Sequence, residues 1–384
     1  MADAAIKLLG SGRAFGALLL VASLALGCAS TGPGGPTWQA DLERQLTEDG
    51  LAGDRIVLAF LVGEAEKGWL AENVPQEGSP RDRLSRLLKE LTVESGLAID
   101  YRRGFTGTAG EVFRERKANC LGFMNLFVGL AREMGISAYF LAIEDKPIYD
   151  RAAGDLVLIA EHVAAGFGEG KDMLLLDFYE GPERTYDSVR RLSDVQALAR
   201  YYSNRGVEVL QEGKARQAVP WLETAVKLDP QLASAWVNLG VAERRTGDLV
   251  AAEAAYDKAL ELDARSVSAY QNFAALLKLK GEEARAQGLL AISERLGSDN
   301  PFAYLNLGDW SLEARHFDDA RRYYRRALTL ATGKAEALAA LGDVDYAQGR
   351  LSQARRWLKR ALKADPTDSR TRRLAERLQP KAGS

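Results

Sequence analysis

The carboxy-terminal half of this 384-residue chain repeats every 34 residues, and this period constrains its fold more than any other feature. Aligned on Pro230, five repeats follow one another without a gap and begin at residues 199, 233, 267, 301 and 335. The eighth position of each repeat is small: Gly206, Gly240, Ala274, Gly308 and Gly342. The twenty-fourth position is bulky: Leu222, Tyr256, Leu290, Tyr324 and Leu358. Small residues let paired helices approach and bulky ones fill the space between neighbours, so the pattern predicts stacked helix-turn-helix units.

This pattern resembles the tetratricopeptide repeat, which implies an all-α solenoid over residues 199–368 with a capping helix in 369–384. Solenoids of helix pairs normally present their first helices to a concave groove that holds a peptide or a partner protein. The candidate groove residues are mixed in type: Val237, Val241, Arg244, Gln271, Lys278, Leu305, Asp309 and Asp343. The sequence therefore predicts a protein or peptide partner without specifying which one.

Cys120 stands at the start of an apolar segment that predicts a buried helix. The apolar residues recur at mostly three- and four-residue spacings, and the pattern ends at Gly135: Leu121, Met124, Leu126, Phe127, Leu130 and Met134. Cys120 would occupy the first turn of this helix. There, unsatisfied backbone N–H groups and the helix dipole stabilise a thiolate, which is the nucleophilic form of cysteine.

A base for this thiol must come from the two histidines of the chain, His162 and His316. His316 lies in a predicted turn between repeat helices and is given no role. His162 lies in an apolar segment that a glycine-containing turn joins to a second one, which predicts a β-hairpin. A turn centred between Glu169 and Gly170 places His162 directly opposite Asp177 on one face. A one-residue change of register would separate them, because neighbouring positions face opposite sides of a sheet.

Cysteine at a helix start, then histidine and aspartate on adjacent strands, is the arrangement of a cysteine acyl-transfer site. Three segments resemble the transglutaminase-like superfamily, which includes papain-like peptidases, amidases and inactive members: 119–138, 161–163 and 175–178. The resemblance implies an α+β transglutaminase-like (papain-like) domain that uses no cofactor. It also implies that Cys120 is the nucleophile, His162 the base and Asp177 the acid that orients the histidine.

Three interpretations of Cys120 remain open. The chain is a thiol enzyme that cleaves or transfers acyl groups of peptide or amide bonds, with the repeats recruiting a substrate or partner. Alternatively, it is a binding scaffold whose transglutaminase-like domain is inactive and whose Cys120 is a small core residue. In the third interpretation, it is an assembly factor in which Cys120 senses redox state. An accessible cleft at Cys120, His162 and Asp177 would separate the enzyme from the scaffold.

The amino terminus predicts export. Lys7 and Arg13 precede an apolar run at 14–26, which has about the length of a secretory signal core and is short for a membrane-spanning helix. Residues 24–28 resemble a bacterial lipobox, which implies that Cys28 is lipidated and becomes the mature amino terminus. The alternative is an ordinary signal peptide that is cut nearby. With Cys28 lipidated, Cys120 is the one free thiol and no internal disulfide forms.

The sequence thus predicts an envelope lipoprotein that faces the periplasm and is held to a membrane by the lipid on Cys28. Its predicted parts are a signal peptide at 1–27, a tether at 28–37, a transglutaminase-like domain at 38–196, repeats at 199–368 and a cap at 369–384. The basic runs at 321–326 and 355–360 invite a nucleic-acid interpretation. Predicted export and a formal net charge of −2 favour solvated outer helix faces instead. Two cysteines and two histidines disfavour a zinc site.

Overall fold

The computed structural model describes most of the chain in nine segments: residues 3–8, 38–51, 56–143, 149–152, 155–158, 162–169, 173–179, 188–330 and 334–379. Cys28, the tether at 28–37 and most of the predicted signal peptide lie outside the described residues. The chain divides into two compact units, and neither unit is continuous in sequence. The first comprises Met1–Pro147, Ala160–Glu208 and Thr224–Pro230; the second comprises Ile148–Ile159, Val209–Glu223 and Gln231–Ser384.

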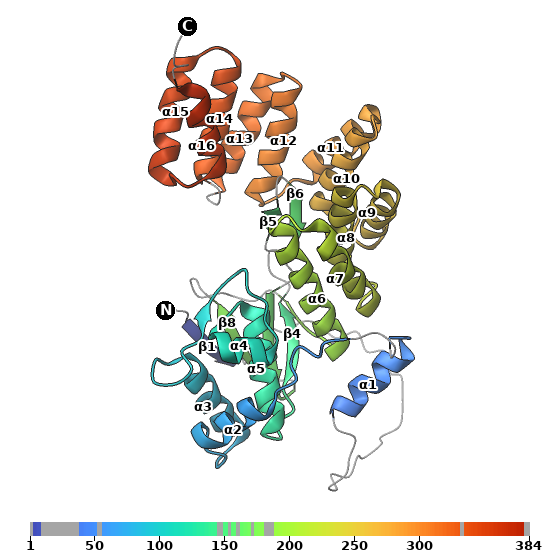
Figure 1. Ribbon diagram of the computed structural model, residues 1–384, viewed down its shortest axis with the longest axis vertical. Coiled ribbons are helices and arrows are strands. Elements are labelled where there is room, and N and C mark those ends of the chain that lie inside the picture. Colours follow the sequence, from blue (N-terminus) through green and yellow to red (C-terminus); the bar gives the residue numbers. More distant parts are fainter. Residues whose placement is uncertain are drawn as a thin grey trace, which may run out of the picture. The chain divides into compact units, whose positions relative to one another are not determined.

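The first unit contains a five-stranded antiparallel sheet in the order β1-β8-β7-β4-β9 (Figure 1). Its strands are β1 (Asp3–Leu8), β8 (Leu174–Tyr179), β7 (His162–Phe167), β4 (Tyr139–Ile143) and β9 (Val189–Arg191). Every residue of β4 is buried, as its uninterrupted apolar sequence requires. Strand β1 belongs to the predicted signal peptide. A mature chain that begins at Cys28 would lack it, and β8 would then form one edge of the sheet.

The first unit contains one apolar helix, α5 (Cys120–Glu133), and several more polar ones. The others are α1 (Trp38–Glu48), α2 (Glu64–Asn73), α3 (Pro80–Thr92) and α4 (Ala109–Glu115), and a short parallel pair joins β2 (Asp100–Tyr101) to β3 (Lys117–Ala118). Helix α5 packs against β7 and β8 on one side and against α2, α3 and α4 on others. All residues from its start to Ala131 are buried, because the helix is apolar around most of its circumference. The predicted buried helix that begins at Cys120 and stops at Gly135 is confirmed.

The repeat region forms successive pairs of antiparallel helices. The first pair, α6 (Asp194–Gln211) and α7 (Ala215–Leu228), is divided between the two units. The second unit continues with α8 (Ala233–Thr246), α9 (Leu249–Leu262), α10 (Val267–Leu279), α11 (Glu283–Leu296), α12 (Pro301–Glu313), α13 (Phe317–Thr329), α14 (Lys334–Ala347), α15 (Leu351–Ala364) and α16 (Ser369–Leu378). Each of the four pairs from α8 to α15 packs together, and α16 covers α14 and α15.

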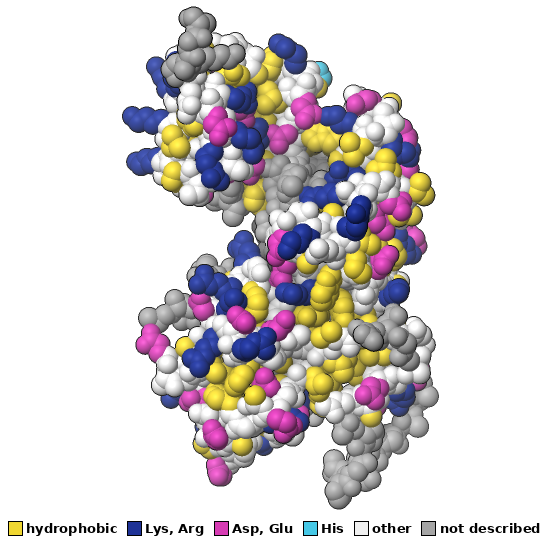
Figure 2. Space-filling view, in the orientation of Figure 1, with side chains coloured by type: hydrophobic (Ala, Val, Ile, Leu, Met, Phe, Trp, Pro, Cys, Tyr) yellow, Lys and Arg dark blue, Asp and Glu magenta, His cyan; other side chains and the backbone are white. Residues whose placement is uncertain are grey.

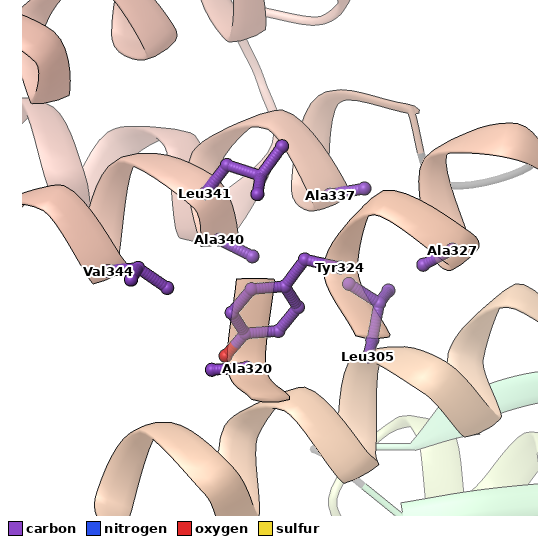
Figure 3. Close-up of a cluster of buried hydrophobic side chains, with 8 residues drawn as sticks. All are labelled: Leu305, Ala320, Tyr324, Ala327, Ala337, Ala340, Leu341 and Val344. Carbon is purple, nitrogen blue, oxygen red and sulfur yellow. The ribbon is translucent and has the colours of Figure 1, made fainter. Parts of the chain in front are cut away.

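In two repeats the small eighth position meets the bulky twenty-fourth position, since Gly240 faces Tyr256 and Gly308 faces Tyr324. In Figure 3, Tyr324 of α13 lies at the centre of a buried cluster with Leu305 of α12 and with Ala337, Ala340, Leu341 and Val344 of α14. A Cβ added to Gly308 would lie 2.5 Å from Cδ1 of Tyr324, a separation that real side chains do not adopt. The glycine at the eighth position is therefore required by the tyrosine at the twenty-fourth.

A β-hairpin that the sequence did not predict belongs to the second unit. Strands β5 (Tyr149–Ala152) and β6 (Asp155–Leu158) pair antiparallel between β4 and β7 in the sequence. Strand β6 lies against α8 and α10, and β5 lies against α12 (Figure 1). The hairpin therefore packs on the first helices of three successive repeats.

The basic runs lie on solvated helix faces, as predicted. Arg322, Arg325, Arg355 and Arg356 are exposed on second helices of their repeats, and Figure 2 shows Lys and Arg side chains gathered over α15 and α16. Within the described segments, no helix has both the length and the apolar character that crossing a bilayer requires.

Candidate active site

Asn119 places Cys120 in the first turn of α5. The Asn119 side chain caps the helix, because its Oδ1 accepts a hydrogen bond from the Gly122 N–H at 2.9 Å. Its Nδ2 donates to Thr106 Oγ1 at 2.6 Å, so the amide is held on both sides. The beginning of the helix is thereby set one residue before the cysteine, and the thiol lies close to the positive end of the helix dipole.

His162 and Asp177 face one another, but through a different register from the predicted one. Ala165 pairs with Leu176 and Phe167 pairs with Leu174, so the two strands are displaced by two residues from the predicted pairing. The prediction that His162 lies directly opposite Asp177 is therefore wrong. The reason is the connection, because β7 ends at Phe167 and β8 begins only at Leu174. Because side chains alternate between the two faces of a sheet, a displacement of two residues leaves each side chain on the same face. His162 and Asp177 are therefore diagonal neighbours on one face of the sheet.

The three predicted residues come together in one buried cluster. His162 Nε2 lies 2.5 Å from Asp177 Oδ1, and the His162 ring also interacts with the Cys120 thiol, which accepts a hydrogen bond from the Val163 N–H. His162 and Asp177 are each 3 % exposed and Cys120 is 7 % exposed. The histidine thus bridges the thiol and the carboxylate.

The charges of this cluster favour a thiolate and an imidazolium. Burial by itself raises the pKa of Cys120, but the positive charge of His162 and its hydrogen bond, with that of Val163, lower the pKa below the usual value for a thiol. Burial by itself lowers the pKa of His162, but the thiolate and the hydrogen bonds to Asp177 and Cys120 raise it to about 10. Both shifts therefore favour a proton on the imidazole over a proton on the sulfur.

Two segments that adjoin the site residues in sequence lie outside the part of the chain that the structure describes. Residues 159–161 precede His162 and residues 180–187 follow β8, and both ranges lie outside the described residues. The accessible cleft therefore stays a prediction. Among the residues that are described, no three His, Cys, Asp or Glu side chains group in a way that could hold a metal ion.

A row of asparagines on the repeat helices was not among the predicted functional residues. The sixth position is asparagine in the first four repeats, and all four side chains are buried: Asn204, Asn238, Asn272 and Asn306. Their spacing equals the repeat period, so an alignment of the repeats position by position would have found them. Because equivalent positions face the same way in successive repeats, Asn238, Asn272 and Asn306 form a row across α8, α10 and α12.

Comparisons with known proteins agree with the repeat assignment. Two family profiles described as tetratricopeptide repeat match residues 204–267 and 311–378. The carboxy-terminal half is a tetratricopeptide-repeat array. The search of curated proteins finds no significant match.

Solved structures that resemble the chain include two proteins described as tetratricopeptide proteins. The Pseudomonas aeruginosa pilF protein is 23 % identical, with 48 % of this chain and 85 % of that chain covered and a TM-score of 0.40. A thermophilic tetratricopeptide protein of Thermus thermophilus is 23 % identical, with 47 % and 98 % covered and a TM-score of 0.42. YrrB, a tetratricopeptide protein with an unusual peptide-binding site, is 17 % identical, with 46 % and 92 % covered and a TM-score of 0.33. At these values the likeness carries no inference about activity or partners.

Two candidate groove residues of the tetratricopeptide array are committed to its cap. Arg370 of α16 donates to Asp343 Oδ2 at 2.7 Å, to Asp309 Oδ1 at 2.6 Å and to the Tyr324 hydroxyl at 3.1 Å. Arg377 adds a further bond to Asp343. The prediction that Asp309 and Asp343 are offered to a ligand is therefore wrong, because the capping helix uses both carboxylates to close that end of the array.

Proposed function

We propose that the chain is a thiol enzyme that cleaves or transfers the acyl group of a peptide or amide substrate. The observation that carries the proposal is the approach of His162 Nε2 to within 2.5 Å of Asp177 Oδ1, in a ring that also meets the thiol at the start of α5. Asp177 orients the imidazole and supports its positive charge, and His162 holds the proton of Cys120. In this proposal the first unit is a transglutaminase-like domain.

The reaction proceeds through a thioester. The Cys120 thiolate attacks the substrate carbonyl and forms a C–S bond, while the negative charge moves to the carbonyl oxygen. The backbone N–H of Cys120 belongs to the first turn of α5, whose N–H groups have no partners within the helix, and it is the first candidate donor to this oxygen. His162 then gives its proton to the leaving amine as the C–N bond breaks. Water or a second amine then attacks the thioester carbonyl and gives a proton to His162. The C–S bond breaks, which releases the acid or the new amide and restores the thiolate and the imidazolium.

The tetratricopeptide array supplies a protein-binding role, and we propose that it recruits the substrate or a partner protein. We further propose that the predicted lipid on Cys28 holds the chain to a membrane of a bacterial cell envelope, facing the periplasm. The predicted signal sequence and lipobox support this location.

A second candidate function is a binding scaffold with an inactive transglutaminase-like domain. The observation that favours it is the burial of Cys120, since a buried cysteine is commonly a small core residue. In that case the repeats carry the function, and the His162–Asp177 pair serves only the stability of the sheet.

The pH dependence of Cys120 alkylation distinguishes the two functions. The full chain with Cys28→Ser has Cys120 as its single thiol, so uptake of iodoacetamide reports on that residue alone. In an enzyme, alkylation persists well below pH ~8.5, the pKa of a free thiol, and His162→Ala moves the titration upward. Slow alkylation with the same pH profile in both chains would instead establish a structural cysteine. Cys120→Ala is the control for labelling elsewhere.

A further inference from the structure

The β5–β6 hairpin leaves the first unit and joins the second. It connects β4 to β7, whose facing residues Ile143 and His162 pair directly. The chain thus departs from the sheet and returns to it at neighbouring points, and Ile148–Ile159 between them groups with the repeats. A shorter connection would be sufficient to join two adjacent antiparallel strands. The additional length forms a strand pair that lies on the tetratricopeptide array.

The hairpin covers the concave face of the array. Strand β6 lies against α8 and α10, and β5 lies against α12. These are the first helices of three successive repeats, which line the concave side of such solenoids. Packed layers of secondary structure are about 10 Å apart, so no second extended peptide fits between β6 and these helices. A ligand and the hairpin therefore exclude one another from this face.

Two buried asparagines on these helices have the chemistry to bind an extended backbone. One edge of β6 pairs with β5, and the N–H and C=O groups of its other edge are directed away from that partner. An asparagine side chain carries one acceptor and two donors, so it can bond a backbone N–H and a backbone C=O together. Asn238 on α8 and Asn272 on α10 lie on the two helices that β6 contacts. Recognition through the backbone accepts many sequences, provided that the segment is extended.

We propose that the β5–β6 hairpin is an intramolecular occupant of the tetratricopeptide groove, and that the groove binds an extended peptide segment only by displacing it. The hairpin is tethered at both ends, which gives it an effective concentration on the order of millimolar. An external peptide must overcome this advantage. In the sequence, the hairpin lies between β4 and β7, the strand that begins at His162.

A replacement variant tests this proposal in the full chain. Residues 149–158 are exchanged for a Gly-Ser segment of equal length, and a fluorescein-labelled synthetic peptide with the sequence of residues 149–158 is titrated against each protein. Fluorescence anisotropy should show that the variant binds the peptide at least roughly tenfold more tightly than the wild-type chain does. In the variant, Asn238→Ala should weaken this binding, whereas Gln353→Ala on the exposed face of α15 should leave it unchanged.

Two results of the peptide titration would overturn the proposal. Equal binding to both chains would mean that the hairpin does not block the groove, and binding to neither chain would mean that the groove does not hold this segment. Hydrogen exchange gives a second measurement on the unaltered protein. The amides of β6 should be protected, and Val157→Pro, which removes one amide and disturbs the strand, should increase both their exchange and the binding of the labelled peptide. Unprotected β6 amides in the wild-type chain would also refute the proposal.

Discussion

Replacing Gly308 of α12 with alanine should destabilise the tetratricopeptide array, although alanine is the better helix former. The helix preference alone would stabilise the array by about 1 kcal/mol. The new Cβ, however, would lie 2.5 Å from Cδ1 and 2.9 Å from Cζ of Tyr324. That ring is completely buried, and its hydroxyl donates to Asp309 at 2.7 Å and accepts from Arg370 at 3.1 Å, so it has little freedom to withdraw.

The expected net loss is about 2 kcal/mol. Overpacking of a well-filled core costs about 1–3 kcal/mol, and the restrained ring places this site at the upper end of the range. Subtracting the gain of about 1 kcal/mol from helix preference leaves the net value. The melting temperature of the array should fall by roughly 4–8 °C, since domains of this size lose roughly 2–4 °C for each kcal/mol.

Thermal and urea unfolding, followed by far-ultraviolet circular dichroism, measure this effect. Gly288→Ala in α11 is the matched control, because a Cβ there meets nothing within 4 Å and the helix preference should stabilise the array by up to about 1 kcal/mol. The third repeat suggests a second test, because its eighth position is an alanine, Ala274, and its twenty-fourth position is a leucine, Leu290, instead of a tyrosine. Tyr324→Leu should therefore reduce the cost of Gly308→Ala by about 1 kcal/mol or more. If Gly308→Ala stabilises the array as much as Gly288→Ala does, the packing argument is refuted.

Two further substitutions test the charged clusters. Asp177→Asn removes the charge that supports the imidazolium, so the pKa of His162 should fall from about 10. Alkylation of Cys120 should then slow at neutral pH and recover only near pH ~8.5, as for an ordinary thiol. An unchanged pH profile would contradict the role assigned to Asp177. Arg370→Met leaves two aspartates without their buried cation and should cost about 3–5 kcal/mol in the unfolding assay. Arg373→Met, an exposed change on the same helix, should cost less than about 0.5 kcal/mol, and equal effects of the two would exclude a role for the buried network.

Much of the candidate site could be predicted because its parts are local. An asparagine cap and an apolar helix place Cys120 in a first turn through contacts within a few residues, and alternation along a strand determines which face His162 occupies. The pairing of His162 with Asp177 was predicted through the wrong register, because the length of the connection could not be read from its glycines. The prediction that His162 and Asp177 share one face of the sheet still holds, because the two strands are displaced by an even number of residues.

By itself, the sequence determined the helix pairs of the repeats and the helix that begins at Cys120. These depend on spacing along the chain, and every repeat has a small residue at its eighth position and a bulky one at its twenty-fourth position. Only the tertiary structure decided that β5 and β6 lie on the first repeat helices, and that Arg370 takes up Asp309 and Asp343. Those contacts join residues that are far apart in sequence, and no local preference encodes them. They form because a strand edge and a buried carboxylate must each find a partner once the chain is compact.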